Sequence, residues 1–289
     1  MTTNIIWNQI LTDAERRELI YSGNIFLISA LKSTSKMSDY AFQVLCDKFQ
    51  TNEPETAFNH LPVEEFAKTV EKVKNEFTNS LYSKELIREF LMEIDSDPKE
   101  YFFDVPRIRI VPNYDYLHAG ISYAYAPHRD TWYGGPSYQI NHWMPVLPIK
   151  PEIAMAVWPN YFSTPVQNSS QEFDITYWDK VQRKKAVENI KVESRPHPLP
   201  LEEINTESEL RIAGNPGDIM IFSANHLHGT VPNRTNRARF SIDFRTFNKS
   251  DIQTANNSVN TDSQATGMDG DYLRQMFDAN TFSPATSSN

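Results

Sequence analysis

The sequence lacks most features of secreted and membrane-spanning proteins. Its single cysteine, Cys46, excludes an internal disulfide and a cysteine-based zinc cage, and it suits a reducing compartment. No apolar run is long enough to cross a bilayer. The first residues, "MTTNIIWNQILTDAERR", have neither the basic region nor the apolar core of a signal peptide. We therefore expect a cytoplasmic protein that does not enter a membrane.

Positive charge is also scarce. The chain has 28 Lys and Arg against 37 Asp and Glu, which gives a formal net charge of -9. Nucleic acids and anionic membranes are bound through basic surfaces, so this balance argues against both as general partners. The 289 residues, 39% of them hydrophobic, are enough for an ordinary globular core. A small-molecule partner is the expectation that remains, and the oligomeric state is left open.

The first hundred residues predict helices. In "LPVEEFAKTVEKVKNEFTNS", Phe66, Val70, Val73 and Phe77 recur at helical spacing and predict one buried face. Pro62 suits the first turn of this helix, and acidic residues follow it there. The stretch "SKELIREFLMEI" repeats the apolar pattern. These helices are expected to pack against a core.

A β-rich part follows from about residue 103. Segments rich in β-branched and aromatic residues alternate with Pro, Gly and Asn, in "FDVPRIRIVPNYDY", "GISYAYAPHRD", "SYQINHWMPVLPI", "IAMAVWPNYF", "ELRIAG", "GDIMIFSANHLHGTV" and "ARFSIDFRTF". We expect a single domain over 1–247, helical over 1–100, with a β core over 103–247 and a polar insertion at 161–208. The remainder, 248–289, is expected to be a flexible tail with a helical turn at "DYLRQMF" (271–277).

Chemistry is concentrated first in "AYAPHRDTWYGG", where His128 and Asp130 flank Arg129. The string His-Arg-Asp also occurs in protein-kinase catalytic loops, but those loops need an Asn five residues after the Asp, and Gly135 stands there. A Gly-rich phosphate loop, a Val-Ala-Ile-Lys strand and an Asp-Phe-Gly motif are missing as well. The kinase hypothesis is therefore rejected.

A metal site explains the same residues better. On a strand, residues i and i+2 point to the same side, so His128 and Asp130 can bind one ion while Arg129 turns away. A third ligand is needed, and other histidines could supply it: His60, His118, His142, His197, His226 and His228. Two histidines and one carboxylate form the facial triad of non-haem Fe(II) oxygenases, which leaves positions open for a co-substrate and dioxygen.

The third ligand is sought in "IFSANHLHGTVPNRTNRARFSIDFR". A His before Gly-Thr, a nearby Asn and an Arg-x-Ser eleven residues after the His resemble the distal half of the phytanoyl-CoA dioxygenase family, to which ectoine hydroxylase is related. The matching residues are His228, Gly229, Thr230, Asn233, Arg239 and Ser241. His226 is the alternative ligand, but Arg237, eleven residues beyond it, has no Ser two positions further on. We favour His228.

The resemblance implies a double-stranded β-helix (a jelly-roll, cupin-like core) behind N-terminal helices. It implies Fe(II) bound by His128, Asp130 and His228, with 2-oxoglutarate and O2 as co-substrates. Arg239, with Ser241 and Thr230, would bind 2-oxoglutarate, since a guanidinium offers a planar fork for its distal carboxylate. A carboxylate at position 130 makes hydroxylation the default, because related halogenases have Gly or Ala there, although desaturation and ring closure use the same triad. The family's Pro-Gly-Ser-His turn is replaced by "WPNYFSTP".

Five residues are candidates for the substrate site: Arg107, Arg109, Trp132, Gln139 and Asn141. The two arginines share one face of a predicted strand, where they either bind an anion or are ordinary solvated charges. Trp132 and Tyr133, just past the metal-binding segment, either wall the pocket or belong to the core. Buried amides need hydrogen-bond partners, which makes a ligand role plausible for Gln139 and Asn141.

The expected function is that of an Fe(II)- and 2-oxoglutarate-dependent dioxygenase. Its substrate would be a small polar metabolite, an amino-acid derivative or a natural-product intermediate, that is anionic or zwitterionic. Two alternatives stay open: a cupin-like metalloenzyme that does not use 2-oxoglutarate, and a non-catalytic ligand-binding protein on the same fold.

Overall fold

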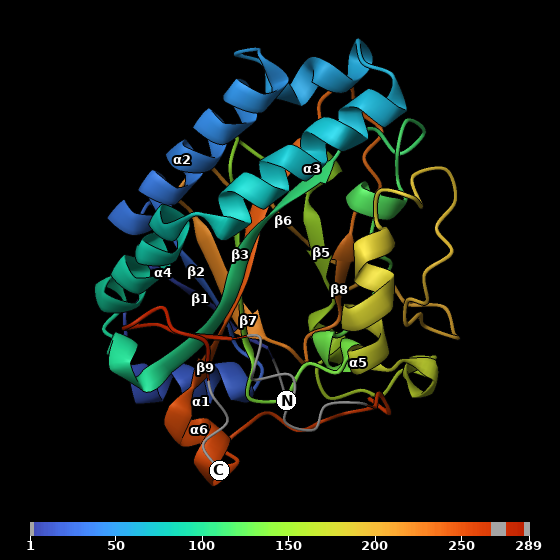
Figure 1. Cartoon of the computed structure of the whole chain (residues 1–289). Coiled ribbons are helices and arrows are strands. Elements are labelled where there is room, and N and C mark those ends of the chain that lie inside the picture. Colours follow the sequence, from blue (N-terminus) through green and yellow to red (C-terminus); the bar gives the residue numbers. More distant parts are fainter. Residues whose placement is uncertain (1–2, 267–275, 286–289) are drawn as a thin grey trace.

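The fold combines N-terminal helices with two β-sheets (Figure 1). Residues from both sheets line one cavity. The computed structural model describes residues 3–266 and 276–285. Its α-helices are α1 (Asp13–Tyr21), α2 (Lys32–Phe49), α3 (Val63–Asn79), α4 (Leu81–Glu93), α5 (Ile175–Tyr177) and α6 (Lys249–Thr254). Its strands are β1 (Ile5–Trp7), β2 (Ile25–Ile28), β3 (Tyr101–Val111), β4 (Ile140–Pro145), β5 (Met155–Val157), β6 (Leu210–Ile212), β7 (Ile219–Ser223), β8 (His228–Thr230), β9 (Arg239–Asn248) and β10 (Phe277–Asp278).

The helices α2, α3 and α4 cover the outer face of the larger sheet (Figure 1). Helix α3 begins directly after Pro62, whose fixed φ suits a helix start, and its first turn carries Glu64 and Glu65. The predicted apolar stripe of α3 is buried, and so is the stripe of α4 that includes Leu86 and Phe90. Burial of these side chains against the sheet forms the main core.

The larger sheet is mixed and has seven strands in the order β1-β2-β7-β4-β9-β3-β10. The β1–β2 pair is parallel, and the other pairs are antiparallel. The smaller sheet has the order β6-β5-β8. The chain is therefore a mixed helix-and-sheet protein, as its helical start and β-rich second part predicted, with a large mixed sheet as its centre.

Alternation along β3 and β9 gives the larger sheet one apolar and one polar face. Ile108 and Ile110 of β3, and Phe240 and Ile242 of β9, belong to the core beneath the helices. The residues between them line the cavity or lie beside it: Arg107 and Arg109 on β3, and Arg239, Ser241, Asp243 and Arg245 on β9. The register pairs Arg109 with Ser241 and Arg107 with Asp243. The inner face is thus rich in charge.

Three predicted elements differ from those observed. The expected strand at "GISYAYAPHRD" is instead irregular, with 3-10 turns at Gly120–Ser122 and Asp130–Tyr133. The expected strand "GDIMIFSANHLHGTV" is two strands, β7 and β8, which belong to different sheets. The first hundred residues contain β1 and β2 as well as helices, and β2 pairs with β7 inside the large sheet.

The insertion and the tail pack on the core. The segment 161–208 consists of short helical turns and loops, and its Ile175 and Trp178 are buried. In the tail, Asp251 accepts hydrogen bonds from Arg17 and Tyr21, and Asp262 accepts them from Arg129 and Trp132. The described part of 248–289 therefore differs from the expected loose tail.

The helical turn expected at 271–277 lies mostly outside the described residues; its last residue is in β10. Among the helices in the described ranges, none has the length and apolar character needed to span a membrane.

Candidate metal centre

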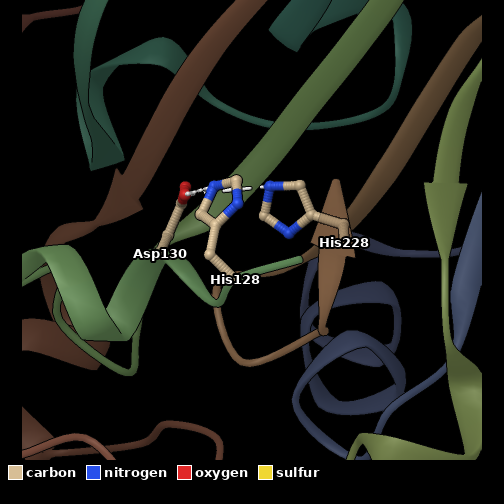
Figure 2. Close-up of side chains that lie close together, drawn as sticks. All are labelled: His128, Asp130 and His228. Carbon is tan, nitrogen blue, oxygen red and sulfur yellow. Dashed lines mark ion pairs between the residues drawn. The ribbon is translucent and has the colours of Figure 1, made fainter. Parts of the chain in front are cut away.

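Three buried side chains that line the cavity converge: His128, Asp130 and His228 (Figure 2). The Nε2 atom of His128 lies 3.7 Å from Asp130 Oδ1, and that of His228 lies 3.8 Å from the same oxygen. One ligand atom from each residue lies within 4.8 Å of the other two. Two imidazoles and one carboxylate at this spacing could hold a single metal ion.

The backbone fixes these positions through one isolated bridge. The N–H groups of His128 and His228 each donate to the other's carbonyl, at 2.8 Å and 2.9 Å. The N–H of Asp130 donates to the carbonyl of Ala224, and the intervening Arg129 is extended. Because its backbone is extended, residues 128 and 130 point to the same side, although this segment is a single bridge and not the predicted strand.

Arg129 points away from the centre, as expected, and its fully buried guanidinium holds surrounding loops. It donates to the carbonyls of Tyr161, Thr164 and Asn225, and it pairs with Asp262. Asp262 also accepts from Trp132 Nε1 at 2.6 Å. A buried arginine with its donors satisfied in this way anchors the loops that carry the metal-site residues.

Both histidine rings are oriented by backbone carbonyls. His128 Nδ1 lies 2.8 Å from the carbonyl of Ala126, and His228 Nδ1 lies 2.9 Å from that of His226. These contacts place the ring proton on Nδ1 and leave Nε2 as the lone pair for a metal. His226 therefore contributes through its main chain, and its own ring nitrogens face the carbonyls of Ser223 and Gly23.

Asp130 is held by amides and by Arg245. Gln139 Nε2 donates to Asp130 Oδ2 at 2.8 Å and to Asn141 Oδ1 at 2.7 Å, and Arg245 Nε lies 3.4 Å from Oδ2. Oδ1 is the oxygen that faces the two imidazoles. Gln139 and Asn141, predicted as substrate contacts, line the cavity but are engaged with the carboxylate.

The protonation states also suit a metal. Burial and the neighbouring His228 lower the pKa of His128 to about 3. Burial raises the pKa of Asp130, but Arg245 and the two histidines lower it more, to about 2. At neutral pH His128 is neutral and Asp130 is ionised, which are the forms that bind a metal ion.

The other candidate histidines lie elsewhere. His142 faces the helical side, where it stacks on Phe244 at 4.5 Å between ring centroids. His197 belongs to the insertion, and His118 is exposed and stacks on Tyr114. His60 is exposed as well. Among the described residues the cluster at 128, 130 and 228 is the group arranged to hold a metal.

Arg239 lies in the same cavity and has no carboxylate partner among the described residues. Its Nη1 donates to the carbonyl of Ala154 at 2.9 Å, and its Nε has no partner. Burial and nearby Arg109 lower its pKa to about 10, so it is still charged at neutral pH. Ser241, on the same face of β9, has a buried hydroxyl without a partner. Such unsatisfied buried donors indicate a site for an anion.

The cavity has a volume of about 460 Å³, within the range of sites for small organic ligands. Arg107 and Arg109 line the cavity, so their side of β3 faces inward and is not a solvated surface. Each of the two is paired with a carboxylate at 2.5 Å, Arg107 with Asp104 and Arg109 with Asp243. Thr230 lines the cavity as well. Trp132 does not: it is fully buried in a core cluster. Of the two alternatives for Trp132, this burial favours the core.

Tyr133, one of the two aromatic residues expected at the pocket wall, lines the cavity and packs against His128 with ring centroids 5.2 Å apart. Other residues of the cavity wall were not predicted as site residues, among them Tyr125, Trp178, Arg195 and Lys74. These four come from three separate parts of the chain, and of the four only Tyr125 lies near a recognisable motif, three residues before His128. Arg245, an alternative to Arg239 as the co-substrate anchor, also lines the cavity and continues the two-residue period of Arg239, Ser241 and Asp243 along β9.

No family model matches the chain, and no curated protein matches it. Solved structures resemble it at low identity. EvdO2 from Micromonospora carbonacea var. aurantiaca, also solved with 2-oxoglutarate, is 14% identical with a TM-score of 0.40, over 60% of this chain and 63% of its own. The epimerase SnoN, in complex with Fe3+, alpha ketoglutarate and nogalamycin RO, is 11% identical with a TM-score of 0.42, over 81% and 83%.

AviO1 from Streptomyces viridochromogenes Tue57 is 11% identical with a TM-score of 0.40, over 83% of this chain and 97% of its own. The chain thus spans less than two thirds of EvdO2 and most of SnoN and AviO1. At such low TM-scores, the function of this chain has to be inferred from its own residues. Membership of the phytanoyl-CoA dioxygenase family stays a prediction.

Proposed function

We propose that the chain is an Fe(II)- and 2-oxoglutarate-dependent dioxygenase that hydroxylates a small polar metabolite. The observation that carries the proposal is the convergence of two imidazole nitrogens and one carboxylate oxygen. Nitrogen and carboxylate ligands suit ferrous iron, and three protein ligands leave positions for small molecules. Iron would be held by His128, Asp130 and His228. A double-stranded β-helix core, with two facing sheets, belongs to the same proposal.

2-Oxoglutarate would be bound through Arg239. Its guanidinium is buried, charged and without a carboxylate partner among the described residues, so an entering carboxylate would complete its pairing. The unpartnered hydroxyl of Ser241 and the cavity-lining Thr230 are further hydrogen-bond donors for this co-substrate. The donor set therefore fits a dicarboxylate.

With iron, 2-oxoglutarate and O2 bound, the site would supply hydroxylation: substrate C–H and dioxygen give C–OH, while 2-oxoglutarate gives succinate and carbon dioxide. The protein's own contribution is to hold the ligand side chains in position and to exclude water from the centre. Gln139 and Arg245 fix the Asp130 carboxylate, backbone carbonyls fix the histidine rings, and the aromatic wall keeps water from the centre. Asp130 also occupies the ligand position that halogenases keep open for a halide.

Succinate release by purified protein tests this function. Protein supplied with Fe(II), 2-oxoglutarate and oxygen should form succinate, and more of it with a true substrate present. Asp130→Ala should lose both iron binding, measured by elemental analysis, and succinate formation, because it removes the only anionic ligand. Asp115→Ala, which changes an exposed aspartate, is the matched control and should behave as wild type. A wild-type protein that binds iron but leaves 2-oxoglutarate intact with every substrate tried would contradict the proposal.

A further inference from the structure

The cavity contains two cations that lack a carboxylate partner among the described residues. Most of its arginines form ion pairs: Arg107 with Asp104, Arg109 with Asp243, Arg183 with Asp179, Arg195 with Glu193, and Arg245 with Asp104 and Asp130. Arg239 and Lys74 differ from these arginines, because the hydrogen bonds of their charged groups go to backbone carbonyls, of Ala154 and of Ile121, and not to a carboxylate of the described residues. Arg239 is assigned above to the co-substrate, so Lys74 is the cation that the proposed function leaves unused.

Lys74 reaches the cavity from α3, which crosses over β3 (Figure 1). Glu71, Lys74, Asn75 and Thr78 all line the cavity, and their spacing puts them on one stripe of the helix beside its buried apolar stripe. The ammonium group of Lys74 donates a hydrogen bond to the carbonyl of Ile121. This contact holds the side chain against the wall and leaves two of its three donors for another partner.

The surroundings of Lys74 are mainly positive. Arg109 and Arg107 approach from β3 and Arg195 from the insertion, whereas Asp243 of β9 and Glu71 of its own helix are the acidic groups nearby. Burial lowers the pKa of Lys74 to about 7, and the three arginines add to this effect. Keeping a half-buried cation beside three others is unfavourable unless an anion joins them.

We propose that Lys74 binds an anionic group of the substrate, a carboxylate or a phosphate, at the end of the cavity formed by α3, β3 and the segment around Arg195. This inference rests on the proposed function for the identity of its ligand as a substrate. Arg107, Arg109 and Arg195 already have carboxylate partners, so they contribute only to the positive potential at this place. Lys74 supplies the positive charge that has no carboxylate partner among the described residues.

The rest of the cavity indicates what joins this anionic group to the reacting carbon. Tyr123, Tyr125, Tyr133 and Trp178 line the wall, and Tyr125 and Tyr133 each lie 5.2 Å from the His128 ring by centroids. Aromatic side chains of this kind bind flat or apolar groups. The substrate is therefore an anion with a planar or apolar body, held by the anion at Lys74 and presenting its other end to the metal centre.

Binding of three probes to metal-free protein, without 2-oxoglutarate, tests the anion site directly. Benzoate, phenyl phosphate and neutral benzamide share a flat ring and differ in the group attached to it. Titration calorimetry should detect binding of one or both anions and none of benzamide. Whichever anion binds more tightly identifies the group as carboxylate or phosphate.

Substitutions then locate the site. Lys74→Met should weaken anion binding at least about tenfold, because a charge-assisted hydrogen bond is lost, while Lys74→Arg retains it. Lys72→Met is the matched control, since Lys72 is exposed on the same helix and should bind the anions as wild type does. Lys74→Met should weaken anion binding by the same factor in a protein that also carries Arg239→Met. This result would show that the anions bind at Lys74 and not at the co-substrate anchor.

A pH titration makes the test independent of how well Lys74→Met folds. Between about pH 6 and 9 benzoate stays ionised. The wild-type affinity for benzoate should fall over this range as Lys74 loses its proton, and that of Lys74→Arg should stay constant. Equal affinities in wild type and Lys74→Met, a flat wild-type profile, or no binding of either anion to wild type would overturn the inference.

These outcomes are separate from those of the proposed function. Anion binding at Lys74 without succinate formation would contradict only the dioxygenase activity. Succinate formation without anion binding at Lys74 would contradict only this inference.

Discussion

The two carboxylate oxygens of Asp130 have different neighbours. Oδ1 faces the Nε2 atoms of both histidines, whereas Oδ2 accepts from Gln139 and lies near Arg245. A carboxylate with one oxygen fixed by hydrogen bonds presents the other in a constant direction. The same division applies to the rings, in which Nδ1 is held and Nε2 points to the centre. The directions of the three side chains are therefore fixed by the protein itself.

Replacement of Arg239 should affect the co-substrate and leave the metal in place. Loss of a buried ion pair should weaken 2-oxoglutarate binding by about 2–5 kcal/mol in Arg239→Met, measured by anaerobic calorimetry. Iron content should stay near that of wild type, since Arg239 does not contact the triad. Arg237→Met is the control, because that side chain is exposed and pairs with Glu55. Unchanged 2-oxoglutarate affinity in Arg239→Met would mean that another arginine is the anchor.

Among the elements, those with strict periodicity could be predicted from the sequence. The apolar stripe of α3 and the alternation in β3 follow from local spacing, so both elements were found. The segment Gly120–Tyr133 has strand-like composition, yet its backbone is used to wrap the metal centre and forms 3-10 turns. Composition could not show this, because the partners that decide it, Ala224 and His228, lie about a hundred residues away.

The residues of the candidate site also fall into those that could be predicted from the sequence and those that could not. His128, Asp130, His228 and Arg239 belong to short motifs and could be named in advance. Lys74, Trp178 and Arg195 line the cavity because α3 and the insertion, which lie far apart in the sequence, meet there, and none of these residues stands in a motif. The described tail was missed for a related reason: its polar residues are held by buried charges such as Arg17 and Arg129, which composition does not reveal.

In the insertion, Glu193 is one of the residues that hold this segment against the core. Its carboxylate accepts from the N–H of Gly120 at 2.8 Å and from Arg195. Burial raises the pKa of Glu193, but hydrogen bonds from His197, Arg195 and Gly120 lower it more, so it stays ionised at neutral pH. Glu193→Gln would leave Arg195 buried without its counter-ion.

The expected result is local opening of the insertion without global unfolding. Hydrogen exchange of amides around 175–197 should become faster in Glu193→Gln, while that of the core strands stays as in wild type. Glu203→Gln changes an exposed residue of the same insertion and should have no effect. Equal exchange in the two variants would show that Glu193 does not fasten this segment.

For the whole molecule, Asp13 connects the first helix to the rest of the fold. It accepts from Ser96 and Tyr101 at 2.5 Å and pairs with Arg16 and Arg17 at 2.9 Å. Burial raises its pKa, but the hydrogen bonds from Ser96, Tyr101 and Arg17 outweigh this, and the net pKa is lowered. Arg17 in turn pairs with Asp251 of the tail. Asp13 is therefore linked to the residues around Ser96 and Tyr101 and, through Arg17, to Asp251 of α6.

The lowered pKa gives the stability a definite dependence on pH. A carboxyl group with a lower pKa in the folded state than in the unfolded state stabilises the fold above its unfolded pKa, near 4. That stability is lost as the pH falls from there through the folded pKa. Asp13→Asn should lower the free energy of unfolding by about 1–3 kcal/mol at neutral pH, where a charged hydrogen-bond acceptor is lost, and by much less near pH 3.

Urea unfolding of wild type and Asp13→Asn between about pH 7 and 3 would measure how the difference between their free energies of unfolding shrinks. Asp39→Asn, at an exposed position on α2, should instead follow the wild-type curve throughout. A constant difference between Asp13→Asn and wild type across this range would mean that the contribution of Asp13 does not come from its charge.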